Sequence, residues 1–178
     1  FISGTGSNLK NLINFSKTKK SPISIDLIIS NTIKAKGLKY SNQYKIKKKI
    51  LNFKNIRIAE KRLLNLLKQN KIQFICLAGF MKILSSKFIK QFNGKIINIH
   101  PSLLPRYKGL NTHSRAIQNK DKFTGCSVHY VTEKLDSGKI IIQKKIKILK
   151  KDTPKSLAKK VLKQEHKLYP KAILKIFN

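Results

Sequence analysis

The chain has 178 residues, of which 40 are Lys or Arg and 7 are Asp or Glu, so its formal net charge is +33. This length suits one ordinary domain, and a hydrophobic share of 40% excludes a wholly disordered chain. No apolar run approaches the roughly 18 residues of a membrane span, and no export signal opens the chain. Two distant cysteines, Cys76 and Cys126, predict neither a disulfide framework nor a metal motif. We expect a single domain over residues 1–178 that acts in the cytoplasm.

The positive charge raises the possibility of a nucleic-acid partner. However, 36 of the 40 basic residues are Lys, and the chain also has 26 Ile and 14 Asn, so residues with A/U-rich codons dominate it. A surface selected for phosphate contacts would favour Arg and concentrate charge on one element, whereas here Lys runs through the whole chain. Codon bias on solvated faces therefore explains most of the charge, and the scarce acids become the informative residues.

Strand and helix patterns alternate through the first hundred residues. Phe1-Ile2-Ser3 reads as the end of a truncated first strand, and Ile56-Arg57-Ile58 gives only a weak signal. In chain order we expect a helix from about Leu9, a strand at Ile25–Ser30, a helix at Ile33–Tyr44, a helix at about Ala59–Asn70, a strand at Ile72–Leu77, a helix capped by Ser85 or Ser86 and running through Phe92, and a strand at Lys95–His100. This alternation predicts an α/β domain with a mostly parallel central sheet flanked by helices.

The last eighty residues predict further strands and a long helix. We expect a helix at about Thr112–Asn119 and strands at Ser127–Val131 and Ile140–Ile148. Asp152-Thr153-Pro154 predicts the start of the last helix, which reaches about Tyr169 or beyond unless Pro170 interrupts it.

A glycine-rich turn at Gly4-x-Gly6-Ser7-Asn8 lies between a strand signal and a helix. Free N–H groups and the helix dipole favour phosphate at such a place. The third glycine of a dinucleotide fingerprint is replaced by Leu9, so the loop is a poor site for NAD. A phosphate site and a plain strand-to-helix turn both remain open from these residues alone.

Asn98 and His100 project from the same face of a strand that Pro101 ends. An amide donor beside an imidazole at the carboxyl end of a strand can stabilise an oxyanion and move a proton. Asp136 could orient His100 and raise its pKa. The alternatives are a structural histidine with a turn-capping Asn, and a turn role for Asp136.

The other candidate residues give weaker signals. His129 alternates within a strand and is expected to be packed rather than catalytic, and no metal spacing links the four histidines, which include His113 and His166. Cys76 is expected to be inert in an apolar strand.

Taken together, these segments resemble the folate-dependent formyltransferases over nearly the whole chain. The segments that carry the resemblance are Ser3–Leu9, Leu77–Leu84, Asn98–Pro105, Tyr107–Leu110, Thr112-His113, Gly125–His129, Glu133–Gly138 and Gln164-Glu165-His166. The resemblance implies a single-domain Rossmann-like formyltransferase fold. It also implies formyl transfer from 10-formyltetrahydrofolate to the amine of glycinamide ribonucleotide in purine synthesis, with 10-formyltetrahydrofolate as co-substrate and no metal.

The resemblance also implies roles for particular residues. Asn98, His100 and Asp136 would be catalytic, the first two at a tetrahedral oxyanion and the third sustaining the charged imidazole. The ribonucleotide would be held by Gly6, Ser7 and Asn8 at its phosphate and by Glu165 at its glycinamide part. The folate pocket would be lined by Met81, Lys82, Ile83, Leu84, Asn98, Val131 and Asp136. A cis peptide at Leu104-Pro105 is implied as well.

The chain departs from the family pattern in three places. Asn111 stands where a His is usual, Lys82 where an Arg is common, and an upstream folate-contacting Arg falls near Ile56 or Arg57. A methionyl-tRNA formyltransferase and a folate deformylase are related alternatives that normally have an additional domain. A non-catalytic nucleic-acid-binding protein is the alternative from another class. We expect small-molecule partners, no specific nucleic acid, no membrane, and a monomer or homodimer.

Overall fold

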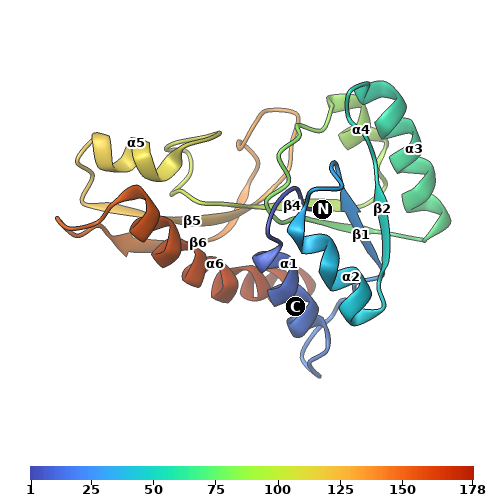
Figure 1. The fold of residues 1–178 in the computed structure, drawn as a ribbon, viewed down its shortest axis with the longest axis horizontal. Helices are drawn as coiled ribbons and strands as arrows, with labels where there is room; N and C mark the ends of the chain where they lie inside the picture. Colours follow the sequence, from blue (N-terminus) through green and yellow to red (C-terminus); the bar gives the residue numbers. More distant parts are fainter. The chain divides into compact units, whose positions relative to one another are not determined.

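The computed structural model describes residues 1–178, in which helices and strands alternate (Figure 1). The helices are α1 (Ser7–Ser16), the short 3-10 helix η1 (Lys36–Leu38), α2 (Lys39–Tyr44), α3 (Ile56–Gln69), α4 (Ser86–Gln91), α5 (Thr112–Gln118) and α6 (Pro154–Phe177). The strands are β1 (Leu27–Ser30), β2 (Lys47–Ile50), β3 (Phe74–Leu77), β4 (Lys95–His100), β5 (Phe123–Tyr130) and β6 (Ile140–Lys147). The fold class is therefore α/β, as the sequence predicts.

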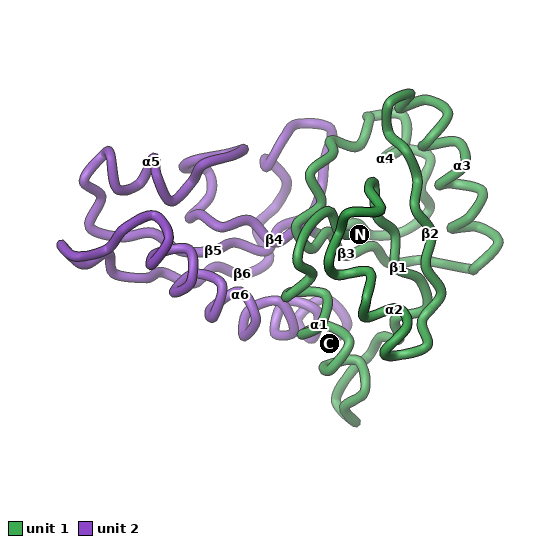
Figure 2. Tube along the Cα trace, viewed as in Figure 1, with its two compact units in different colours: residues 1–97 green, residues 98–178 purple.

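The chain forms two compact units, residues 1–97 and residues 98–178 (Figure 2). The boundary falls within β4, so the last residues of this strand, Asn98 to His100, begin the second unit. The single formyltransferase domain over residues 1–178 stays a prediction.

Parallel pairing organises the start of the first unit. β1 pairs with β2 in parallel, with Leu27 opposite Lys47 and Ser30 opposite Ile50. Ile2 forms a parallel bridge with Ser30, so the strand signal at the first residues is confirmed. The buried side chains of Ile28 and Ile29 lie in the core, as the β-branched run predicts.

An antiparallel pair and a long helix organise the second unit. β5 pairs with β6 from Phe123 opposite Lys147 to His129 opposite Ile140, with an irregularity between Val128 and His129. Helix α6 packs on both strands. β1 and β2 form a two-stranded sheet, and β3, β4, β5 and β6 form a second sheet in this order.

Capping residues begin two helices where the sequence predicts them. The Ser85 hydroxyl accepts a hydrogen bond from the Phe88 N–H at the start of α4. Thr153 and Ser156 form a reciprocal capping box before α6, whose first residue is Pro154. These local signals fix the helix starts because each supplies a partner for an N–H that the helix itself leaves unbonded.

The structure differs from the sequence prediction at three elements, whereas α6 runs beyond Tyr169, which is one of the two predicted outcomes. The helix expected from Ile33 begins only at Lys36, and Ile56–Ile58 forms the first turn of α3 because the Asn55 side chain caps it. Strand β2 was not predicted, since its residues Lys47–Ile50 are all exposed and form a strand only through pairing with β1. Pro170 does not end α6, which continues to Phe177.

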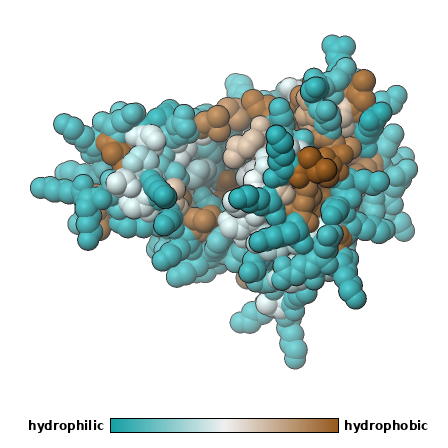
Figure 3. Space-filling model, in the orientation of Figure 1, coloured by the Kyte–Doolittle hydropathy of each residue, from teal (hydrophilic) through white to brown (hydrophobic).

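The surface is dominated by polar side chains, and Figure 3 shows hydrophilic residues over much of the viewed face. Several large apolar side chains are nevertheless exposed, among them Met81 and Ile83 of the first unit. None of the helices offers a stretch that is both long and apolar enough for a membrane span.

Candidate active site

The glycine-rich loop leads directly into α1, as the sequence predicts. Gly6 has a φ of +73°, and a Cβ at this position would lie 2.6 Å from the Gly37 Cα, so a side chain does not fit. No side chain caps α1, and its first turn contains no acid. Ser7 is half-buried and Asn8 is buried. The start of this helix thus keeps the positive end of its dipole without a neighbouring acid.

The predicted folate segment follows β3 in the first unit. The Met81 N–H donates a hydrogen bond of 2.7 Å to the Ser3 hydroxyl, which ties the segment to the first residues of the chain. Met81 and Ile83 are 63% and 64% exposed, and Lys82 is exposed as well, whereas Leu84 is 4% exposed and belongs to the core. Three of the four predicted lining residues are therefore accessible to a ligand.

The second unit begins with the polar end of β4. Asn98 is half-buried and His100 is buried, and the strand ends at His100, immediately before Pro101. The two polar side chains follow the two-residue period of the strand, as predicted.

Hydrogen bonds fix the loop after β4. The Ser127 hydroxyl donates to the Ser102 carbonyl oxygen at 2.6 Å and accepts from the Leu104 N–H at 3.1 Å. The Ser102 hydroxyl in turn donates to the Arg106 carbonyl at 2.6 Å, which gives Ser102 a structural role. The peptide between Leu104 and Pro105 is cis, which confirms that expectation.

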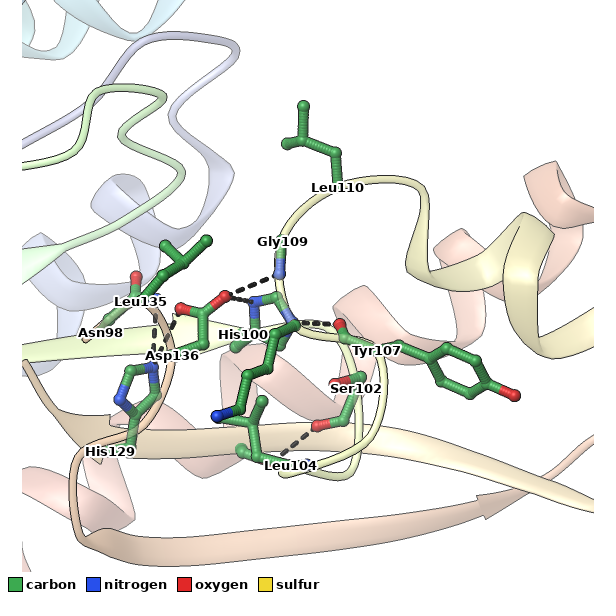
Figure 4. A network of polar contacts seen from close by, with 12 residues as sticks. Asn98, His100, Ser102, Leu104, Tyr107, Gly109, Leu110, His129, Leu135 and Asp136 are labelled. Carbon is green, nitrogen blue, oxygen red and sulfur yellow. Dashed lines mark hydrogen bonds and ion pairs between the residues drawn. The ribbon is translucent and has the colours of Figure 1, made fainter.

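Asp136 lies between two imidazoles (Figure 4). Its Oδ2 is 3.4 Å from Nδ1 of His100, and its Oδ1 is 3.6 Å from Nε2 of His129. Oδ2 also accepts a hydrogen bond of 2.9 Å from the Gly109 N–H. Asp136 has a φ of +45°, a backbone conformation that non-glycine residues seldom adopt and that its surroundings must hold. The structure therefore brings Asn98, His100 and Asp136 together within one unit.

His129 links Asn98 to Asp136, a connection that the sequence analysis missed. It is 1% exposed, so the expectation that it is packed is confirmed. Its Nε2 is 3.3 Å from the Asn98 Nδ2, and its Nδ1 is 2.8 Å from the Tyr130 carbonyl oxygen. A signal was present in the sequence, because His129 ends the Gly125–His129 segment on which the resemblance partly rests. Periodicity alone marked it as a strand residue.

Burial lowers the pKa of His100 below the ordinary histidine value, although the Tyr107 carbonyl and Asp136 both act to raise it. The expectation that the Asp136 carboxylate acts to raise this pKa is confirmed, but the overall shift is downward. Desolvation of the ring, which is only 5% exposed, is the largest influence on this pKa and outweighs the charge of Asp136. A neutral imidazole that can accept a proton near neutral pH follows from this balance.

Desolvation acts to raise the pKa of Asp136, but the neighbouring His129 ring, the hydrogen bond from the Gly109 N–H and the charge of His100 lower it overall. The carboxylate is consequently ionised at neutral pH. An ionised carboxylate beside a neutral imidazole stabilises the imidazolium that forms when the ring takes up a proton.

The remaining candidates of the second unit lie on α6 and after β5. Glu165 is buried on α6. Burial, and next the charge of Glu165, raises the pKa of the Cys126 thiol to about 12, so Cys126 stays protonated and is a poor nucleophile. Val131 is half-buried in the loop between β5 and β6 that also contains Asp136.

The positions that depart from the family pattern lie at helix starts or on the surface. Asn111 has a φ of +57° and precedes α5, and Ile56 and Arg57 are exposed in the first turn of α3.

Burial lowers the pKa of His113 and of His166. No group of three or more His, Cys, Asp or Glu side chains is arranged to hold a metal ion.

Comparisons with known proteins agree with this arrangement. The Formyl transferase family model matches residues 1–173. The trifunctional purine biosynthetic protein adenosine-3 of Homo sapiens is 41% identical over 97% of this chain, but the chain spans only 17% of its length. The phosphoribosylglycinamide formyltransferase of Haemophilus influenzae is 39% identical, and the match covers 97% of this chain and 82% of that protein.

Solved structures give the same result. The crystal structure of phosphoribosylglycinamide formyltransferase from Brucella melitensis matches with a TM-score of 0.93 and 41% identity over 99% of this chain and 92% of the other. The enzyme of the same name from Bacillus halodurans matches with a TM-score of 0.94 and 34% identity over 100% and 93% of the two chains. The fold and the family model agree over nearly the whole sequence, and the chain therefore belongs to the formyl transferase family.

Proposed function

We propose that this chain transfers the formyl group of 10-formyltetrahydrofolate to the amine of glycinamide ribonucleotide, a step of purine synthesis. The observation that carries the proposal is the set of Asn98, His100, Asp136 and His129 at the end of β4, where one carboxylate lies between two imidazoles and an amide. Relatives named phosphoribosylglycinamide formyltransferase match almost the full chain, which supports this acceptor.

The first chemical step is attack of the substrate amine on the formyl carbon. A C–N bond forms, the formyl oxygen becomes an oxyanion, and the attacking nitrogen must lose a proton. His100 takes this proton at Nδ1, because its Nε2 lies 2.9 Å from the Tyr107 carbonyl and donates to it. Asp136 lies 3.4 Å from the same Nδ1 and stabilises the imidazolium that results.

The oxyanion is stabilised by Asn98 and by the charged ring of His100. The Asn98 amide has two N–H groups, one of which is directed at the His129 Nε2 at 3.3 Å, and the second is left for the oxyanion. His129 thus orients the amide. The intermediate then collapses: the bond from carbon to the folate nitrogen breaks, and that nitrogen receives the proton from His100, directly or through water.

The resemblance to the family assigns the substrate-binding residues. Gly6, Ser7 and Asn8 bind the ribonucleotide phosphate at the start of α1, where no acid opposes it. Glu165 binds the glycinamide part. Met81, Lys82 and Ile83, together with the backbone at Leu84 and at Val131, line the folate pocket, and Met81 and Ile83 offer exposed apolar surface there.

The test is a formyl-transfer assay with three acceptors. The purified protein is mixed with 10-formyltetrahydrofolate and with glycinamide ribonucleotide, methionyl-tRNA or no acceptor, and release of tetrahydrofolate is followed. We expect release only with glycinamide ribonucleotide. Release without an acceptor would indicate a deformylase instead, and release only with the tRNA would indicate the related tRNA-modifying activity.

The reaction is expected to take place in the cytoplasm, where small-molecule substrates and no nucleic acid or membrane are the partners. A monomer or a homodimer is the expected state, and light scattering coupled to size-exclusion chromatography distinguishes them.

A further inference from the structure

The turn at residues 107–109 forms backbone hydrogen bonds to both members of the His100–Asp136 pair (Figure 4). The carbonyl oxygen of Tyr107 lies 2.9 Å from the His100 Nε2, and two residues later the Gly109 N–H donates to the Asp136 Oδ2 at 2.9 Å. The 3.4 Å separation between imidazole and carboxylate thus depends on where this turn places two backbone groups.

Tyr107 holds a backbone conformation that it would not adopt unaided. Its φ is +55°, in the left-handed region where a residue with a Cβ is disfavoured. Such a conformation persists only where the surroundings impose it. The contacts of the Tyr107 side chain therefore bear directly on where its carbonyl points.

The Tyr107 hydroxyl has three polar partners. It donates to the Asp121 Oδ2 at 2.7 Å, and it accepts from the Asn119 Nδ2 at 2.9 Å and from the Arg106 Nη2 at 3.2 Å. Arg106 and Asp121 also form an ion pair of 2.8 Å, in which the Asp121 side chain is only 9% exposed. The residues that follow α5 are in this way joined to the turn.

Arg115 of α5 also contacts this turn. Its guanidinium lies 5.0 Å from the centre of the Tyr107 ring, within reach of a cation–π interaction. Its Nη1 donates to the Lys108 carbonyl at 2.7 Å and, at the longer distance of 3.4 Å, to that of Leu110. Two of the chain's four arginines and one of its seven acids therefore converge on a single tyrosine.

We propose that Tyr107 is a positioning residue for the His100–Asp136 pair, held by Asp121, Asn119 and Arg115 so that the turn presents its carbonyl to the imidazole and the Gly109 N–H to the carboxylate. The proposal rests on the proposed function for its kinetic consequence. Its structural consequence, the restraint on the His100 ring, is independent of any substrate.

The first readout is the His100 Nε2–H signal in the NMR spectrum of protein with ¹⁵N-labelled histidine, without substrate. In the wild type we expect this proton to be protected from exchange by the Tyr107 carbonyl. Tyr107→Phe keeps the ring under Arg115 but removes the hydroxyl, so we expect exchange to be faster by about tenfold or more as the turn opens locally. Asp121→Asn is the second variant, because it removes the charge that orders the hydroxyl and Arg106.

The second readout is steady-state kinetics of formyl transfer. We expect Tyr107→Phe to lower kcat by about tenfold while the KM for each substrate stays within about twofold, because misplaced catalytic groups slow the chemical step without removing binding contacts. The matched control is Asp152→Asn, which breaks the 2.7 Å ion pair between Asp152 and Lys160 near the start of α6 and should leave both readouts as in the wild type.

Wild-type kcat and unchanged protection of the Nε2–H in both Tyr107→Phe and Asp121→Asn would overturn the proposal. An equal loss of kcat in Asp152→Asn would also overturn it, because the effect would then be one of general stability. A wild-type protein that transfers no formyl group would refute the proposed function instead, and the exchange measurement would still decide the role of Tyr107.

Discussion

Asp136 serves two imidazoles at once, and this gives His129 a function that burial alone does not. The Asn98 Nδ2 lies 3.3 Å from the His129 Nε2, so the ring orients the amide. The Asp136 Oδ1 lies 3.6 Å from the same nitrogen. We expect His129→Gln to lower kcat by about tenfold, since the amide that stabilises the oxyanion loses its support.

Circular dichroism and thermal melting show whether His129→Gln keeps the fold and stability of the wild type after the packed ring is lost. A variant that melts like the wild type and turns over at the wild-type rate would show that His129 only fills space.

The pH dependence of kcat/KM reports on His100 in the free enzyme. The ring must be neutral to accept the proton, and burial lowers its pKa, so we expect activity to rise with pH and to reach half its plateau below the ordinary histidine value of about 6.5. Asp136 acts to raise this pKa, so Asp136→Asn should move the midpoint to lower pH as well as reduce the plateau. A midpoint that moved to higher pH in this variant would contradict the assigned electrostatics.

At the residue scale, the sequence indicated which polar side chains lie together but not the electrostatic balance among them. The strand period, Pro101 and the scarcity of acids indicated Asn98, His100 and Asp136 as candidates, and the resemblance to the formyltransferases implied their catalytic roles. The lowered pKa of His100 could not be predicted, since it depends on burial by segments remote in the chain. Nor could the part played by Tyr107, which acts through a backbone carbonyl that any residue type would possess.

The glycine-rich turn before α1 offers a test of stability, in which Gly6 is the constrained position and Gly4 is the control. Gly6→Ala places a Cβ 2.6 Å from the Gly37 Cα at a φ of +73°, whereas a Cβ at Gly4 meets no atom within 4 Å. We expect Gly6→Ala to lower the free energy of unfolding by about 2 kcal/mol or more, from strain and steric overlap together.

Gly4→Ala should change the free energy of unfolding by less than about 0.5 kcal/mol. Urea denaturation of the two variants measures the difference. Equal midpoints for Gly4→Ala and Gly6→Ala would mean that the close approach to Gly37 is not a constraint.

At the scale of elements, local signals predicted starts and ends, and tertiary packing decided the exceptions. Ser85 and Thr153 cap helices where expected, because a cap acts within four residues of chain. Helix α6 continues through Pro170, although a proline inside a helix costs about 3 kcal/mol, because Tyr169 and Ile173 beside it are fully buried. The sequence of β2 has no apolar pattern that would predict its pairing with β1.

For the whole molecule, the charge of +33 predicts nonspecific attraction to nucleic acid rather than recognition. We expect a duplex DNA of mixed sequence to bind weakly, and its affinity to fall by about tenfold or more between 50 and 200 mM salt, as counterion release requires. A fluorescence anisotropy titration with two unrelated duplexes measures this. Tight binding to one duplex that persists at the higher salt would favour a specific nucleic-acid partner.

The most direct test of the proposed activity follows the formyl carbon itself. The wild-type protein is supplied with glycinamide ribonucleotide and with 10-formyltetrahydrofolate that carries ¹³C at the formyl group. We expect it to transfer the label into an amide of the ribonucleotide. Asp136→Asn, folded to the same extent by circular dichroism, should do so at least about a hundredfold more slowly. Label that stays on the folate, appears as free formate, or moves equally fast in Asp136→Asn would contradict the account.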